Sequence, residues 1–431
     1  MYKKENMVQL LTASLMYFII IYFSLRLFIE PLLSREKFVV VYTLFSIYVL
    51  GLIFFTKKLH RSDSLILLFC FTLLIRYFFQ IILMPTSFFT IISLFQYLFP
   101  VLFIFIARIV EDKIQERMEN FMVLIALFSV TFGLLNAVFE FVPQFIYTTD
   151  RTIVSDLVVN RAGSLMGPSL ATGGLCGLGG AFLISSRRFP LFIKIVFLSI
   201  FMLVEIKTYS RGGLIFFVII LFVISVGFLK QLTKQKRTTY LLIGAGAAFV
   251  LFMAIIVMAA FRVANMDIYM QRYVFDLFSK KETGNSQRLT SMLMAINKIM
   301  INPLLGIGYG HLGSSAVERE IIGSFSPENY YLKLGAEAGI INLLLFMIIS
   351  LKSLRMSTKI QSPFKYKYLG IIIGFLVWSI FLQTLENDFF AIFYWYSIGQ
   401  LQKLYINEIE VRRNDVNNEN TLHYACRLGL D

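Results

Sequence analysis

Charged residues are scarce in this chain. Asp, Glu, Lys and Arg make up 15% of its 431 residues, hydrophobic residues make up 58%, and the mean hydropathy is +0.74. Soluble domains have about a quarter of their residues charged. The composition therefore excludes an ordinary soluble protein and indicates an integral membrane protein.

Cysteine and histidine are also few. Of the three cysteines, Cys70 and Cys176 lie in apolar runs and Cys426 lies in a polar stretch near the end of the sequence. This spacing indicates neither a disulfide framework nor a metal cluster. The three histidines are equally scattered, so we predict no metal site and no cofactor.

Long apolar runs recur along the chain. A helix needs roughly 20 apolar residues to cross a hydrocarbon core of about 30 Å. We therefore predict an all-α polytopic integral membrane protein with about 12 transmembrane helices. The first run is too long for the apolar part of a signal peptide, and no small-residue cleavage site follows it, so we expect it to remain as a helix. The predicted spans are 7–29, 38–55, 64–84, 88–107, 121–141, 169–185, 190–206, 212–229, 240–260, 330–351, 368–384 and 388–405.

The distribution of positive charge predicts the orientation of these spans. Lys and Arg in short loops favour the cytoplasm. If both termini are cytoplasmic, the cytoplasmic segments hold more than half of the 40 Lys and Arg residues, and the opposite orientation would invert that bias. We therefore expect both termini in the cytoplasm. We attribute most of the net charge of +14 to topology and predict no nucleic-acid partner.

The chain reads as one polytopic transmembrane domain over residues 1–405, followed by a polar cytoplasmic tail over residues 406–431. Two predicted extracytoplasmic segments, 142–168 and 261–329, are longer than a simple connection requires. The second lies between the ninth and tenth predicted helices. Apolar residues recur within it at helical spacing, which predicts an amphipathic helix near 286–300 on the outer membrane surface.

Three arginines fall on the predicted outer side: Arg161 in "NRAGSLMGPSLATGGL", Arg211 in "TYSRGG" and Arg288 in "SQRL". Arginine there runs against the positive-inside bias. Each could extend to lipid headgroups or pair with a nearby acid. A guanidinium group also grips phosphate oxygens with two parallel hydrogen bonds. Three of them beside glycine-rich backbone favour an anion site.

The stretch "ENYYLKLGAEAGIINLLLF" places Glu328 just before an apolar run. Glu328 could cap the helix predicted to begin near Asn329, because the helix macrodipole favours a carboxylate there by roughly 0.3–1 kcal/mol. A carboxylate at a partly dry boundary could also act as a base. The sequence leaves both interpretations open.

The stretch "GYGHLG" matches the pattern G-x-G-x-x-G. That pattern indicates dinucleotide binding only between a strand and a helix of a βαβ unit. No such unit is predicted here, so we assign no dinucleotide site.

Taken together, these motifs resemble the O-antigen polymerase/ligase superfamily, which contains the Wzy-type polymerases and WaaL-type ligases of bacterial surface polysaccharide assembly. The resemblance covers roughly residues 150–350. It depends on the order, spacing and common side of the three arginine motifs, of "NPLLGIGYG" and of "ENYYLKLGAEAGIINLLLF".

The resemblance implies a metal-independent inverting glycosyltransferase that uses undecaprenyl-pyrophosphate-linked oligosaccharides at the outer face of the cytoplasmic membrane. Carried over by position, Arg161, Arg211 and Arg288 hold the pyrophosphate, and Glu328 and Arg288 are the catalytic pair. The residues expected to bind the acceptor are Asn329, Tyr330 and His311.

The residue at one position distinguishes two functions within the superfamily. Its ligases typically have histidine at the position of Glu328, whereas its polymerases often have an acidic or other polar residue. We therefore predict a polymerase of O-antigen or capsular polysaccharide, with membrane lipids and a chain-length regulator as further candidate partners. The alternatives are an O-antigen ligase that uses a lipid A core or protein acceptor and, from another class, a transporter or flippase. Transporters carry their polar features near the bilayer midplane, whereas the unusual residues of this chain cluster at the predicted outer face.

Overall fold

The computed structural model describes residues 2–29, 43–44, 46–51, 63–83, 88–139, 151–154, 157–232, 283–313 and 325–428. The predicted span 240–260 lies outside the described residues, as do most of 38–55 and much of the segment 261–329.

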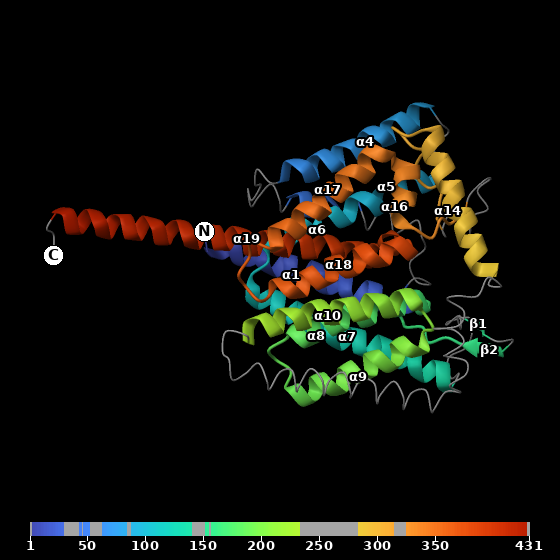
Figure 1. The fold of residues 1–431 in the computed structure, drawn as a ribbon, viewed down its shortest axis with the longest axis horizontal. Coiled ribbons are helices and arrows are strands. Elements are labelled where there is room, and N and C mark those ends of the chain that lie inside the picture. Colours follow the sequence, from blue (N-terminus) through green and yellow to red (C-terminus); the bar gives the residue numbers. More distant parts are fainter. Residues whose placement is uncertain are drawn as a thin grey trace.

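Helices dominate the described part of the chain, and most of the long ones run side by side in one bundle (Figure 1). The helices of the bundle are α1 (Tyr2–Ser24), α4 (Ser64–Leu83), α5 (Phe88–Val101), α6 (Phe103–Ile109), α7 (Asp112–Phe139), α8 (Ser169–Ser185), α9 (Leu191–Lys207), α10 (Arg211–Leu232), α17 (Ile340–Ser357), α18 (Lys365–Phe381) and α19 (Asp388–Leu428). The other elements are α2 (Arg26–Ile29), α14 (Thr283–Ile301), α16 (Tyr330–Ala338), η3 (Thr384–Glu386) and an antiparallel hairpin of β1 (Arg151–Val154) and β2 (Leu157–Asn160).

Six helical stretches among the described residues are long and apolar enough to cross a membrane: Met7–Ser24, Ser64–Leu83, Thr90–Ile109, Asp112–Phe139, Arg211–Phe228 and Ile340–Ser357. Many of their leucine and phenylalanine side chains are exposed on the outside of the bundle, as lipid-facing side chains are. The predicted class, an all-α polytopic membrane protein, is confirmed. The number of 12 spans stays a prediction.

The centre of the bundle is the first half of α19, whose aromatic side chains from Phe389 to Tyr396 are buried. It packs against α6 and α18, while α10 packs against α8 and α18. The helices approach closely where α8 presents small residues. A Cβ atom at Gly174 would lie 2.2 Å from the Phe390 ring, and one at Gly177 would lie 2.4 Å from the Phe216 ring. Small residues permit such close packing between membrane helices.

The prediction of one helix over 330–351 is wrong, because the chain breaks at Gly339 into α16 and α17. Gly339 has a φ of 88°, and a Cβ atom there would lie 2.0 Å from the Leu304 carbonyl oxygen. The next amide, that of Ile340, donates to the carbonyl of Pro303 at 2.8 Å. Only glycine adopts this conformation at such close approach without strain, so the contact with residues 303–304 fixes the break.

The last predicted span, 388–405, also differs, because α19 continues without interruption to Leu428. Residues 406–428, predicted as part of a polar tail, therefore extend the last helix, which projects beyond the bundle in Figure 1.

Figure 1 shows that α14, α16 and the β1–β2 hairpin gather at one end of the bundle, which we call the α14 end. Both chain termini lie toward the opposite end, which we call the terminal end.

Candidate functional site

The predicted amphipathic helix is present as α14 and begins three residues earlier than expected. Ala295 is fully buried, and Ile299 lies against Gly335 of α16. A second flank is apolar but exposed, with Leu289 at 60% and Met300 at 72%. The helix therefore packs on α16 with one face and leaves an apolar stripe uncovered beside it. Arg288 lies in its first half, just before the stripe.

Arg288 forms an ion pair with Glu328 through its Nε atom and the Glu328 Oε2 atom. The two side chains are 47% and 33% exposed. Glu328 has a φ of 48°, in the left-handed region that side chains other than glycine rarely occupy. Such backbone costs about 1–3 kcal/mol, persists only where the surroundings fix it, and clusters at functional sites.

The residue that caps α16 is Asn329, not Glu328. The Asn329 Oδ1 atom accepts a hydrogen bond from the Leu332 N–H at 2.9 Å, and its Nδ2 atom donates to the Ile380 carbonyl at 2.8 Å. Helix capping by Glu328, which the sequence left open, is therefore not observed. Asn329, predicted to bind the acceptor, is committed through both amide atoms to joining α16 and α18.

Arg161 and Arg211 both lie at the turn between α9 and α10. The Arg161 Nε atom donates to the Thr208 carbonyl at 2.7 Å, and the Ala162 N–H donates to the Lys207 carbonyl at 2.8 Å. Arg211 is the first residue of α10. The turn is tight, since Tyr209 has a φ of 52°. Two arginines 50 residues apart in sequence are thus held on one short turn.

The C-terminal end of α18 joins this turn to the Glu328 segment. A Cβ atom at Gly212 would lie 2.6 Å from Trp378 Nε1 and 3.2 Å from Leu382 Cδ1. On the other side, Asn329 bonds to Ile380. The turn beside Arg161 and Arg211 and the segment with Glu328 therefore both contact the end of α18, and Arg288 is connected to them through its ion pair with Glu328.

Sequence reasoning missed a second layer of polar residues behind Glu328. Lys333 of α16 forms an ion pair with Glu386 of η3 at 3.0 Å, with 5% and 11% of the two side chains exposed. Glu337 is fully buried, and its carboxylate accepts hydrogen bonds from the Tyr97 hydroxyl at 2.7 Å and the Leu312 N–H at 2.8 Å. A signal was available, because ionisable residues inside an apolar run are functional hints and both α16 residues lie in the predicted span 330–351.

The remaining predicted acceptor residues lie beside this layer. Tyr330 is 4% exposed, and its ring packs against those of Tyr97 and Phe346 at 6.5 and 5.6 Å. His311 is partly buried, next to the Leu312 N–H that binds Glu337. Of these two, only His311 has a partly exposed side chain.

The "GYGHLG" stretch follows a helix, not a strand, and begins in a loop that packs against the end of α16. Gly308, Gly310 and Gly313 have φ values of 108°, 79° and 105°. The preceding turn bonds to the end of α16, where the Ile307 and Gly308 amides donate to the carbonyls of residues 336 and 337 at 2.7 and 3.1 Å. The glycines of this stretch allow these backbone contacts.

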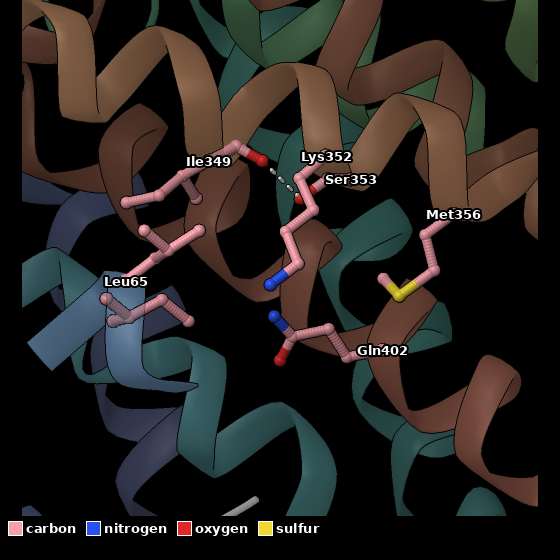
Figure 2. Close-up of a pocket in the computed structure, with 7 residues that line it drawn as sticks. Leu65, Ile349, Lys352, Ser353, Met356 and Gln402 are labelled. Carbon is pink, nitrogen blue, oxygen red and sulfur yellow. Dashed lines mark hydrogen bonds between the residues drawn. The ribbon is translucent and has the colours of Figure 1, made fainter. Parts of the chain in front are cut away.

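A small pocket lies far from these residues, between the start of α4 and the second half of α17 (Figure 2). Lys352 and Gln402 point toward one another across it, among apolar side chains. Ser353 is 14 residues beyond Gly339, which corresponds to about 20 Å along a helix. None of the predicted site residues lines this pocket.

Comparison with known families gives one finding. Residues 195–347 match the family model Wzy_C, described as O-antigen ligase. The matched region contains Arg211, Arg288 and Glu328 but begins after Arg161. No curated protein matches the chain.

Proposed function

Residues 195–347 carry a domain of the O-antigen polymerase/ligase superfamily, and from this premise we propose that the protein is a membrane glycosyltransferase that polymerises a surface polysaccharide. Its substrates are undecaprenyl-pyrophosphate-linked repeat units of an O-antigen or capsule. The α14 end faces the outside of the cytoplasmic membrane, and both termini face the cytoplasm.

The observation that carries this proposal is the Arg288–Glu328 ion pair on strained backbone, beside the turn that holds Arg161 and Arg211. A departing lipid pyrophosphate gains negative charge in the transition state. Donors fixed in advance at such a position are worth on the order of 10²–10³ in rate each. Arg288 contacts Glu328 through Nε, so its two terminal nitrogens can face phosphate oxygens in a fork.

The reaction is a single displacement at the anomeric carbon of the growing glycan. A hydroxyl oxygen of the second lipid-linked unit forms the new bond to that carbon, and the bond from the carbon to the phosphate oxygen breaks with its electron pair. The configuration inverts. The hydroxyl proton passes to the Glu328 carboxylate, and the arginines hold the released lipid pyrophosphate without a metal ion.

The neighbouring surfaces suit such substrates. The exposed apolar stripe of α14, which includes Leu289, Leu293, Ile296 and Met300, offers contact to lipid chains next to Arg288. His311 is the acceptor-site candidate with a partly exposed side chain, whereas Asn329 holds the Glu328 segment in place.

A ligase is the second candidate, because the matching family model is described as O-antigen ligase. Glu328, at the position where the ligases typically have histidine, favours the polymerase. Transport is less well supported, because the arginine-bearing segments gather at the end of the bundle and not at its middle.

The experiment uses purified protein in nanodiscs with its lipid-linked repeat unit as the only substrate, and products are separated on a gel. We expect a ladder from the wild type and its loss with Arg288→Ala and with Glu328→Ala. Lys298→Ala is the matched control, because it removes one positive charge from the same helix about 15 Å away and leaves the ladder intact.

A ladder that survives Arg288→Ala would contradict the pyrophosphate-binding arginine. A product that forms only after a lipid A core or protein acceptor is added would identify a ligase. No product with any acceptor would contradict both transferase proposals.

A further inference from the structure

Glu328 keeps its left-handed backbone beside a glutamine that sequence reasoning did not single out. Gln383 lies just before η3, with its side-chain amide 3.0 Å from the Ser326 hydroxyl. Turned so that both ends of the amide are satisfied, its oxygen accepts a hydrogen bond from the Glu328 N–H at 3.1 Å and its nitrogen donates to Glu386 Oε2. One side chain therefore contacts the Ser326 hydroxyl before Pro327 and the Glu328 N–H after it.

Gln383 is itself held from behind. Glu386, which receives the Gln383 amide, is fixed by its ion pair with Lys333 at 3.0 Å, and both side chains of that pair are nearly buried. The contacts form a continuous chain from Lys333 through Glu386 and Gln383 to the Glu328 N–H. The chain links α16 and η3 to the one residue in the segment with a left-handed φ.

We propose that Gln383 is a positioning residue that aims the Glu328 carboxylate at Arg288 and at the acceptor hydroxyl. On the C-terminal side of Glu328, Asn329 is fixed by its hydrogen bonds to Leu332 and Ile380. On the N-terminal side, Gln383 fixes the Glu328 N–H. With both sides held, the Glu328 side chain leaves the backbone in one direction, toward α14. The catalytic consequence rests on the proposed function, whereas the structural link does not.

The structural link is tested by hydrogen–deuterium exchange of the full protein in nanodiscs, read from peptides covering residues 325–332. Proline has no N–H, so Glu328 is the first exchangeable amide after Ser326. Gln383→Ala and the similarly sized Gln383→Met both remove the acceptor, and we expect faster exchange of one amide there. Gln400→Ala is the control, because Gln400 is a buried glutamine bonded to Ala107 and Tyr396 elsewhere in the bundle.

The catalytic consequence is tested by polymerisation kinetics of Gln383→Met in the wild-type and Glu328→Gln backgrounds. We expect kcat to fall on the order of 10–100-fold in the wild-type background, as misplacement of a reacting group does, with the KM for the lipid-linked donor unchanged. In the Glu328→Gln background we expect no further fall. Gln400→Ala should act equally in both backgrounds.

Unchanged exchange of the 325–332 peptides in both folded Gln383 variants would overturn the inference whatever the protein's activity. Equal falls of kcat in the two backgrounds would overturn the positioning role. A wild type that makes no polymer would count against the proposed function and leave the exchange result to decide the structural link.

Discussion

At the terminal end of the bundle, Arg108 grips both carboxylate oxygens of Asp63 at 2.8 and 2.9 Å, and both side chains are nearly fully buried. At the α14 end, Arg288 meets Glu328 through one nitrogen, and both side chains are partly exposed. The first pair joins the end of α6 to the residue before α4. The second joins α14 to strained backbone before α16.

The two ion pairs differ in burial, and this difference indicates that they contribute differently to stability. Removing one partner of a buried pair leaves an uncompensated charge and is strongly destabilising. The stability of the fold therefore depends on the intact Arg108–Asp63 pair. A partly exposed pair contributes about 0–1 kcal/mol, which does not repay the strain of a left-handed glutamate. The Arg288–Glu328 pair therefore adds little to stability, in keeping with the role in binding and catalysis that we propose for it.

The largest expected effect on stability comes from breaking the buried pair. Asp63→Ala should lower the free energy of unfolding by about 3–5 kcal/mol, because Arg108 would keep its charge without a partner. Chemical unfolding in detergent measures the loss, and Arg288→Ala provides the comparison. A loss below about 1 kcal/mol for Asp63→Ala would remove the distinction between the two ends.

A smaller effect is expected at the cap that holds the Glu328 segment. Asn329→Ala should destabilise the protein by about 1 kcal/mol and reduce polymer formation, because it removes the cap of α16 at the Leu332 N–H and the hydrogen bond to Ile380 of α18. Asn329→Asp is the matched control, since it keeps the oxygen that caps the helix. The same unfolding assay and the gel ladder measure the two effects, and a full ladder from Asn329→Ala would argue against this holding role.

The smallest effect is expected at a pair of the terminal end in which the acidic partner is exposed. Lys403 contacts Asp112, whose side chain is 84% exposed. Asp112→Asn should change the free energy of unfolding by less than about 1 kcal/mol and should leave the ladder unchanged. A large loss would show that exposure does not separate dispensable pairs from structural ones in this protein.

Hydropathy predicted the elements that local sequence controls. The apolar runs around α4, α8 and α10 produce helices near the expected bounds, whereas α7 begins nine residues before its predicted span, and helical periodicity predicted α14. The break at Gly339 could not be predicted in this way, because it depends on carbonyls of residues 303–304, some 35 positions earlier. The continuation of α19 to Leu428 was missed because a polar sequence is compatible with either helix or tail.

The candidate site was predictable only in part. Arg161, Arg211, Arg288 and Glu328 stand out because charge at the edge of an apolar run is conspicuous in the sequence. Gln383 does not stand out, since a neutral amide near a helix end carries no such signal and its partner Glu328 lies 55 residues earlier. The sequence did not decide which residue caps α16, although Asn329 is of a type preferred at this position, and the structure gives the role to Asn329.

An exchange of the two charges separates a role of the Arg288–Glu328 pair in the reaction from a role in the fold. The variant Arg288→Glu/Glu328→Arg keeps an ion pair at the same place. If the pair serves the reaction, we expect a free energy of unfolding within about 1 kcal/mol of the wild type and no polymer ladder, because the arginine and the carboxylate then face the wrong substrate groups. A wild-type ladder from this variant would instead make the pair a structural contact.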